Sequence, residues 1–200
     1  SWLAVAAFGC IPYLFVGLSP VNAYFESMSG FTTTGATILT DFSLYDRPFY
    51  IWRAMTQWFG GLGVIALFVV MLPRLGIAGR QLFFQEASSA PGEGISPKVH
   101  DASLRLWLLY SALTLLLVVL LVVGGMSVYE GFCHAFTTLS AGGFSPNGES
   151  IAGYHNPFIE WVLVIFMVIG GTSYTLQYKA YTRKPTALIR DGEFLFYAGV

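Results

Sequence analysis

Long apolar segments alternate along this chain with short polar stretches that are rich in glycine and hydroxyl side chains. A hydrocarbon core of about 30 Å requires roughly 20 mostly apolar helical residues. By that measure, membrane-spanning helices are predicted at Trp2–Leu18, Ile51–Pro73, Leu104–Val123 and Pro157–Tyr178. A further span is predicted to start at Phe194.

The first and third spans are each followed by a half-span. Turn-forming residues lead into an amphipathic stretch too short to cross a bilayer, at about Asn22–Phe31 and Tyr129–Leu139. Each stretch ends in a Gly-containing segment, GFTTTGAT from residue 30 and FTTLSAGGFS from residue 136. The sequence therefore predicts an all-α membrane protein made of tandem repeats: membrane helix, re-entrant half-helix, irregular strand, membrane helix.

The two copies align at a fixed spacing, which is the signature of an internal repeat. Placing Gly35 on Gly143, an offset of 108 residues, also places the following spans in register from Trp52 and Glu160. The predicted organisation is a first repeat, a cytoplasmic connection whose first part suits an interfacial amphipathic helix, a second repeat, a cytoplasmic linker and the start of another helix. These parts are residues 1–73, 74–103, 104–178, 179–193 and 194–200.

Composition and charge support a location in the lipid bilayer. The chain is 55% hydrophobic and 10% charged, with a mean hydropathy of +0.64, whereas soluble domains are about a quarter charged. No basic stripe is present, so nucleic acid is not an expected partner. Basic residues gather in Arg74–Arg105 and Lys179–Arg190. The positive-inside rule therefore places these segments in the cytoplasm, and both Gly-rich stretches enter from the outer side.

Irregular backbone at membrane depth is tolerated only where protein buries it or where it lines a polar cavity. A row of carbonyls facing a dehydrated cation meets this requirement. Gly35 and Gly143 allow consecutive carbonyls to turn toward one axis, and the half-helix C-termini favour a cation. Neither stretch contains an acidic side chain, which favours a monovalent ion. The candidate lining is Thr32, Thr33, Thr34, Gly35, Ala36 and Thr37 in the first copy, and Ser140, Ala141, Gly142, Gly143 and Phe144 in the second.

Several other residues are candidates for a role in the site or in the packing of the helices. The acids that flank the stretches either concentrate cations at an outer mouth or are solvated surface groups: Glu26, Asp41, Glu130 and Glu149. His134 is expected to be a hydrogen-bonded structural histidine, and the two cysteines, Cys10 and Cys133, to be buried free thiols. Close helix packing is expected at Gly60, Gly61, Gly63, Gly170 and Gly171. Interfacial anchoring is expected of Trp52, Trp58, Trp107 and Trp161.

The segments FESMSGFTTTGAT, QWFGGLGVIAL, MLPRLGI and HAFTTLSAGGFS closely resemble the first two pore repeats of the Trk/Ktr/HKT superfamily of potassium transporters, the bacterial TrkH branch in particular. The resemblance implies four repeats of membrane helix, pore helix, filter strand and membrane helix around one pore, of which two lie here. It implies filter strands at Thr32–Thr37 and Ser140–Ser145. It also implies K⁺ coordination by the backbone carbonyls of Thr33, Thr34, Ala141 and Gly142.

The predicted function is potassium uptake across the bacterial inner membrane, without covalent chemistry or an organic cofactor. The resemblance further implies a homodimer and a cytoplasmic nucleotide-binding, TrkA-like regulatory subunit, for which the basic segments are plausible docking surfaces. The alternative is an intramembrane enzyme or a structural assembly subunit with no ion path. The sequence leaves open whether transport is channel-like or coupled to Na⁺ or H⁺.

Overall fold

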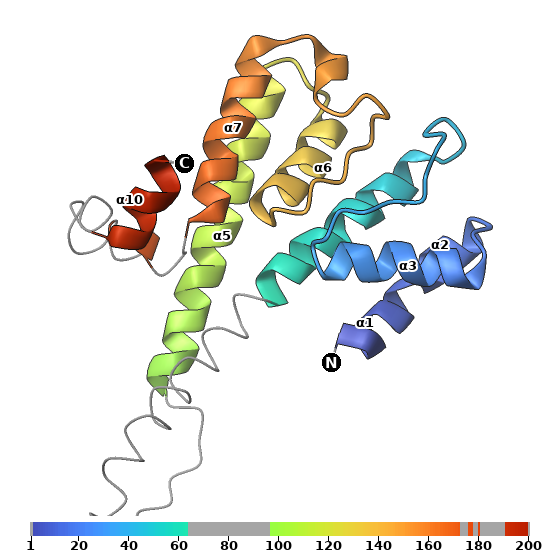
Figure 1. Cartoon of the computed structure of the whole chain (residues 1–200), viewed down its shortest axis with the longest axis horizontal. Helices are drawn as coiled ribbons and strands as arrows, with labels where there is room; N and C mark the ends of the chain where they lie inside the picture. The colour runs from blue at the N-terminus through green and yellow to red at the C-terminus, as the bar shows by residue number, and fades with distance from the viewer. Residues whose placement is uncertain (1, 64–96, 173–175, 178–179, 181–190, 200) are drawn as a thin grey trace, which may run out of the picture.

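The computed structural model describes residues 2–63, 97–172, 176–177, 180 and 191–199, and these ranges contain helices but no β-strand (Figure 1). The first repeat holds α1 (Trp2–Gly9), α2 (Ile11–Phe15), α3 (Pro20–Phe31) and a helix over residues 47–63, hereafter helix 47–63. The second repeat holds α5 (Pro97–Val123), α6 (Val128–Leu139), the 3-10 turn η1 (Ala152–Tyr154) and α7 (Pro157–Gly171). It is followed by α10 (Gly192–Gly199).

The predicted spans are present with changed limits. Within the described ranges, Leu104–Val123 is the one helical stretch long and apolar enough to cross a membrane unaided, while Trp2–Phe15 and Pro157–Gly171 are apolar but shorter. Helix 47–63 starts four residues before the predicted Ile51. The rest of that span, the predicted interfacial helix and residues 181–190 of the linker lie outside the described residues.

The first predicted span is broken into two helices. α1 ends at Gly9 and α2 begins at Ile11, with Pro12 in the first turn of α2. Proline has no N–H to donate to the carbonyl four residues earlier and clashes with it. The thiol of Cys10 donates to the carbonyl of Ala7 at 3.0 Å, next to the break. A single helix over Trp2–Leu18 is therefore the wrong prediction, and Pro12 was the signal for the break.

The half-helices α3 and α6 have the same length, and their first and last residues are each 108 positions apart. Each has 12 residues, or about 18 Å of helix, well short of a bilayer core. Ser19 caps α3 by accepting from the N–H of Asn22, and Ser127 caps α6 by accepting from the N–H of Glu130. The offset of 108 residues therefore holds for both caps and for both helix ends, as predicted.

Beyond the strands the offset becomes 110 residues. Helix 47–63 and α7 begin at residues 47 and 157. A Cβ at Gly60 would overlap the carbonyl of Phe31, and a Cβ at Gly170 would lie 3.3 Å from the carbonyl of Leu139, which is the equivalent residue. The predicted register from Trp52 onward is therefore wrong by two residues, because the second copy has two more residues between its half-helix and its second span.

Two tryptophans of helix 47–63 make interior hydrogen bonds, one across the repeats and one within the first repeat. The Nε1 of Trp58 donates to Oγ1 of Thr114 on α5 at 3.1 Å, and the Nε1 of Trp52 donates to the carbonyl of Gly9 at 3.1 Å. Trp52 and Trp58 are thus packing residues that remain partly exposed, and interfacial anchoring stays a prediction for them as it does for the exposed Trp107 and Trp161. The close-packing prediction is confirmed, since a Cβ would press on a neighbour at Gly60, Gly61, Gly63, Gly170 and Gly171.

Candidate functional site

Both half-helices end in the same hydrogen-bonded turn. After α3, the N–H of Thr34 donates to the carbonyl of Ser29 (3.0 Å), and the N–H of Thr33 donates to that of Gly30 (2.9 Å). These two bonds define a Schellman motif, in which the residue after the cap takes left-handed angles. Thr33 accordingly has a φ of 55°.

The second copy repeats this turn with different side chains. After α6, the N–H of Gly142 donates to the carbonyl of Thr137 (2.9 Å), and the N–H of Ala141 donates to that of Thr138 (3.0 Å). Ala141 has the same φ of 55° as Thr33. Two segments that share only part of their sequence therefore share one backbone path.

Positive φ at Thr33 and Ala141 is a feature that the sequence does not predict, because this position is usually glycine. Left-handed angles cost an L-residue about 1–2 kcal/mol, and a β-branched residue there is an outlier. Such strain clusters at functional sites, where the surroundings enforce it. Gly35 and Gly143, two residues further on, have φ of 75° and 81°, angles that their lack of a Cβ permits.

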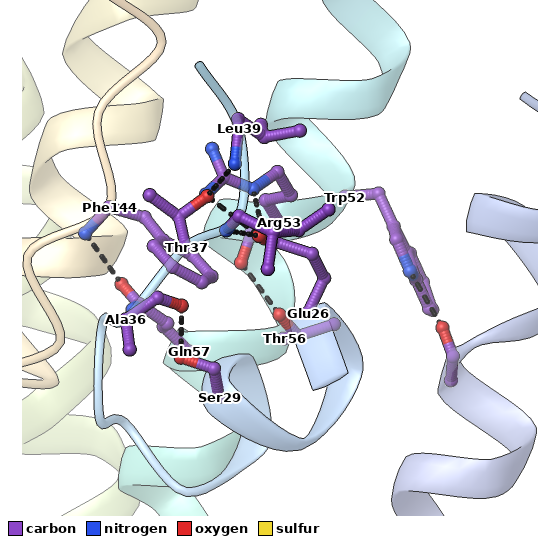
Figure 2. A network of polar contacts seen from close by, with 12 residues as sticks. Glu26, Ser29, Ala36, Thr37, Leu39, Trp52, Arg53, Thr56, Gln57 and Phe144 are labelled. Carbon is purple, nitrogen blue, oxygen red and sulfur yellow. Dashed lines mark hydrogen bonds and ion pairs between the residues drawn. The ribbon is translucent and has the colours of Figure 1, made fainter. Parts of the chain in front are cut away.

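The first strand is held from behind by side chains of α3 (Figure 2). The hydroxyl of Ser29 donates to the carbonyl of Ala36 at 2.6 Å. The carboxylate of Glu26 accepts from the hydroxyl of Thr37 at 2.6 Å and from the N–H of Ile38 at 2.8 Å. Ala36 and Thr37 at the end of the strand, and Ile38 just after it, are thereby fixed to one helix, which determines where the strand runs.

Glu26 is itself held by a buried ion pair with Arg53 of helix 47–63. The Nε of Arg53 lies 3.0 Å from Oε2 of Glu26, and these residues are 1% and 0% exposed. Another guanidinium nitrogen donates to the hydroxyl of Thr37 at 3.0 Å. Glu26 is therefore neither a solvated acid nor a free charge at an outer mouth, and both sequence readings of it are wrong.

Helix 47–63 also holds the second strand. The guanidinium carbon of Arg53 lies 3.9 Å from the centroid of the Phe144 ring. One turn further along, Oε1 of Gln57 accepts from the N–H of Phe144 at 3.1 Å. Arg53 and Gln57 are buried. Two side chains of the first repeat thus fix a residue of the second repeat's strand.

The two strands touch at their glycines. A Cβ at Gly35 would overlap the carbonyl oxygen of Gly142, so this close approach requires glycine. A Cβ at Gly142 would in turn overlap the amide of Gln57. A Cβ at Gly143 meets nothing within 4 Å. The structure therefore brings the two predicted linings together at Gly35 and Gly142.

The remaining predicted lining residues differ in exposure. Backbone and side chains of the first strand are largely exposed at Thr32, Thr34, Ala36 and Thr37. In the second strand, exposed and buried positions alternate, with Ala141 and Gly143 exposed and Ser140, Gly142 and Phe144 buried. Phe144 is thus a packing residue in this part of the chain, and its ring and N–H are both engaged by helix 47–63.

In the second repeat, a different cluster occupies the place of the Glu26 and Arg53 pair. His134 is equivalent to Glu26 by the 108-residue offset, and its Nε2 lies 3.2 Å from the hydroxyl of Tyr154 in η1. The same hydroxyl donates to Glu130 at 3.1 Å. A hydrogen-bonded structural His134 is therefore confirmed. This cluster fastens the loop that contains η1 to α6, whereas the pair in the first repeat fastens the strand.

The other flanking acids have distinct surroundings. Glu130 completes the capping box at the start of α6. Asp41 and Glu149 are exposed, and hydrogen bonds from the hydroxyl and the N–H of Ser43 lower the pKa of Asp41 below its ordinary value. Within the described ranges, no group of three or more His, Cys, Asp or Glu side chains is placed to hold a metal ion. Cys10 and Cys133 are free, and Cys133 is buried as predicted, while Cys10 is partly exposed.

Sequence reasoning missed the side chains behind the strands, although a signal was present. Arg53, Thr56 and Gln57 are the polar residues on one face of an otherwise apolar span. Polar side chains within a span almost always face the protein interior or a water-filled path. Their spacing of three and four residues therefore indicated a helix face directed at the strands.

Comparison with known proteins identifies the family. The family described as "TrkH: Cation transport protein" matches residues 10–196. The chain belongs to the TrkH family. It is 34% identical over 204 residues to the Trk system potassium uptake protein TrkH of Escherichia coli K12, covering 100% of this chain and 42% of that protein. It is 38% identical over 187 residues to TrkG of the same strain, covering 91% and 38%.

A solved structure supports the same assignment. The fold matches the crystal structure of the potassium transporter TrkH from Vibrio parahaemolyticus with a TM-score of 0.85 and 29% identity, over 100% of this chain and 41% of that one. The chain therefore spans about two-fifths of the length of these TrkH-family relatives. The predicted all-α membrane fold is confirmed, and the family is one of transporters rather than enzymes.

Proposed function

We propose that the complete protein takes up potassium ions across a membrane and that this chain supplies two walls of its selectivity filter. The walls are residues 32–37 and 140–144. The backbone carbonyls of Thr33, Thr34, Ala141 and Gly142 serve as K⁺ ligands. The ion itself satisfies carbonyls that would otherwise be costly at membrane depth.

The observation that carries this proposal is the contact of two glycine-centred strands, each leaving the C-terminus of a short helix. Gly35 meets the carbonyl of Gly142, so carbonyl-bearing backbone lies at the seam between the strands. The partial negative charges at the ends of α3 and α6 favour a cation nearby. The Trk potassium uptake proteins to which the chain is similar point to K⁺ as that cation.

The proposal extends to location and partners. The membrane is the bacterial inner membrane. Basic residues gather in the segments 74–105 and 179–190, which places those segments in the cytoplasm and both filter strands on the outer side. The complete protein is a homodimer that binds a cytoplasmic nucleotide-binding regulatory subunit. The word "system" in the relatives' names is in keeping with such a subunit.

The test compares glycine substitutions that carry the same backbone strain. Gly143 (φ 81°) and Gly125 (φ 105°) both have positive φ, and a Cβ at either would meet nothing within 4 Å. Only Gly143 lies in a proposed filter strand. Gly143→Ala and Gly125→Ala are made in the complete protein, and K⁺ and Na⁺ uptake are measured in cells that lack their own K⁺ uptake.

Gly143→Ala is expected to lower the ratio of K⁺ to Na⁺ uptake, whereas Gly125→Ala leaves the ratio unchanged at equal amounts in the membrane. Gly35→Ala should lower the ratio further, because its Cβ would displace the Gly142 carbonyl. Unchanged ratios in correctly inserted Gly35→Ala and Gly143→Ala proteins would rule out these strands as the filter.

A further inference from the structure

Gln57 occupies an unusual place for an amide side chain. It is 0% exposed and sits on helix 47–63 of the first repeat, yet its Oε1 accepts from the N–H of Phe144 in the second repeat at 3.1 Å. The bond joins residues 87 positions apart. It links the second span of the first repeat, helix 47–63, directly to the strand of the second repeat.

The same amide lies against both strands. A Cβ at Gly142 would overlap the Gln57 amide, and a Cβ at Gly35 would lie 3.8 Å from its Nε2. The Gly142 carbonyl oxygen lies where a Cβ at Gly35 would be, so Gly35, Gly142 and the Gln57 amide are close neighbours. Among the described residues, Nε2 has no hydrogen-bond partner, and a buried donor without a partner costs about 1–3 kcal/mol. The N–H groups of Nε2 cannot bind a cation, and Oε1 is engaged by the N–H of Phe144, so the amide acts on the strand backbone and not on the ion.

The second repeat has no such amide. By the 110-residue offset of the second spans, Met167 of α7 is the equivalent of Gln57. Arg53, one turn before Gln57, is likewise replaced by an apolar residue, Leu163. The polar bracing of two strands by one helix is therefore a property of the first repeat, and packing alone does not account for a buried amide there.

We propose that Gln57 is a positioning residue that fixes the spacing between the first and second filter strands, and thereby helps to set K⁺ over Na⁺ selectivity. This inference rests on the proposed function. Discrimination by a carbonyl-lined site depends on its size or on the number and field of its carbonyls. Both quantities change if the Gly35 and Gly142 backbones move apart.

The test uses an isosteric change and a matched control in the complete protein. Gln57→Met keeps the side-chain length and removes the amide. Gln177→Met is the same substitution at an amide whose Nε2 donates to the carbonyls of Ile169 and Thr172, neither of which is in a filter strand. Gln57→Glu retains an oxygen that can accept from the Phe144 N–H. The ratio of K⁺ to Na⁺ uptake is measured for each at equal amounts in the membrane.

Gln57→Met is expected to lower this ratio about tenfold, the equivalent of roughly one hydrogen bond. Gln57→Glu should lower it less, and Gln177→Met should not change it. An unchanged ratio in Gln57→Met, alongside a lowered ratio in Gly35→Ala, overturns this inference and leaves the proposed filter intact. Unchanged ratios in both overturn the filter as well.

Should Gln57→Met fail to reach the membrane, a compensated variant carries the test. In Gln57→Ala/Gly142→Ala, the new Cβ at position 142 enters the space that the Gln57 amide vacates. This double variant is expected to insert better than Gly142→Ala and to show the same lowered ratio. A wild-type ratio in the double variant contradicts the inference.

Discussion

Removing the charge of Glu26 should destabilise the protein more than any other single loss of a carboxylate in the described residues. The carboxylate accepts from Thr37, Ile38 and Arg53 at 2.6, 2.8 and 3.0 Å, and it is fully buried. Glu26→Gln keeps the shape but leaves the Arg53 guanidinium buried without a counter-charge. Loss of one partner of a buried pair costs about 3–5 kcal/mol.

The size of the effect can be set from the surroundings of Arg53. In the Glu26→Gln variant the guanidinium would still contact the Phe144 ring, 3.9 Å away, and the Thr37 hydroxyl, 3.0 Å away. A desolvated cation–π contact stabilises a buried cation by about 2 kcal/mol, so the charge of Arg53 is not left wholly uncompensated. The loss should therefore lie near the lower end of the range. In a complete protein about two and a half times as long as this chain, as the coverage of its relatives indicates, it corresponds to a fall of about 3 °C in the temperature at which detergent-solubilised protein loses its monodisperse peak.

The double variant Glu26→Gln/Arg53→Met separates the charge from the shape. Replacing both partners with neutral groups of similar volume removes the buried charge, so the double variant should be more thermostable than Glu26→Gln. Glu149→Gln, at an exposed carboxylate, is the matched control and should leave the temperature unchanged. A Glu26→Gln protein as stable as wild type, or a double variant no better than the single one, refutes the reasoning.

Two further predictions concern packing and topology. Gly60→Ala should lower the free energy of unfolding by about 1–3 kcal/mol, and by more than Gly170→Ala. The Cβ of Gly60→Ala would overlap the Phe31 carbonyl, whereas the nearest carbonyls to a Cβ at Gly170 are 3.3 Å away. Equal losses in a melting assay would contradict this. In a background without Cys10 and Cys133, the variants Asp46→Cys and Asn147→Cys should react with an impermeant thiol reagent from outside the cell, and Ser89→Cys should not; the reverse pattern would invert the proposed orientation.

Much of the repeat was predictable from the sequence, because it depends on patterns that are local. Short amphipathic stretches followed by glycine predicted α3 and α6, and the alignment of Gly35 with Gly143 gave an offset that both helices obey. Pro12 also carried a local signal, although the apolar run around it obscured the break between α1 and α2.

The remainder depended on contacts between distant residues. The offset of 110 residues between helix 47–63 and α7 follows from loop length, which hydrophobic pattern does not constrain. The left-handed angles at Thr33 and Ala141 result from a turn that most sequences fill with glycine. The contact of Gln57 with Phe144 joins two repeats, so the polar face of helix 47–63 indicated that Gln57 points inward but not which residue it contacts.

The bracing by helix 47–63 has a consequence for the order in which the protein is made. Chains are synthesised from the N-terminus, and earlier parts can fold first. In the part of the chain that the structure describes, the side-chain hydrogen bonds to the first strand from Ser29, Glu26 and Arg53 lie within the first repeat. The second strand takes its contacts with Arg53 and Gln57 from a helix that is already in the membrane. The first repeat thus acts as a template on which the second is completed, and the reverse order of insertion would leave the second strand held only by its turn at the end of α6.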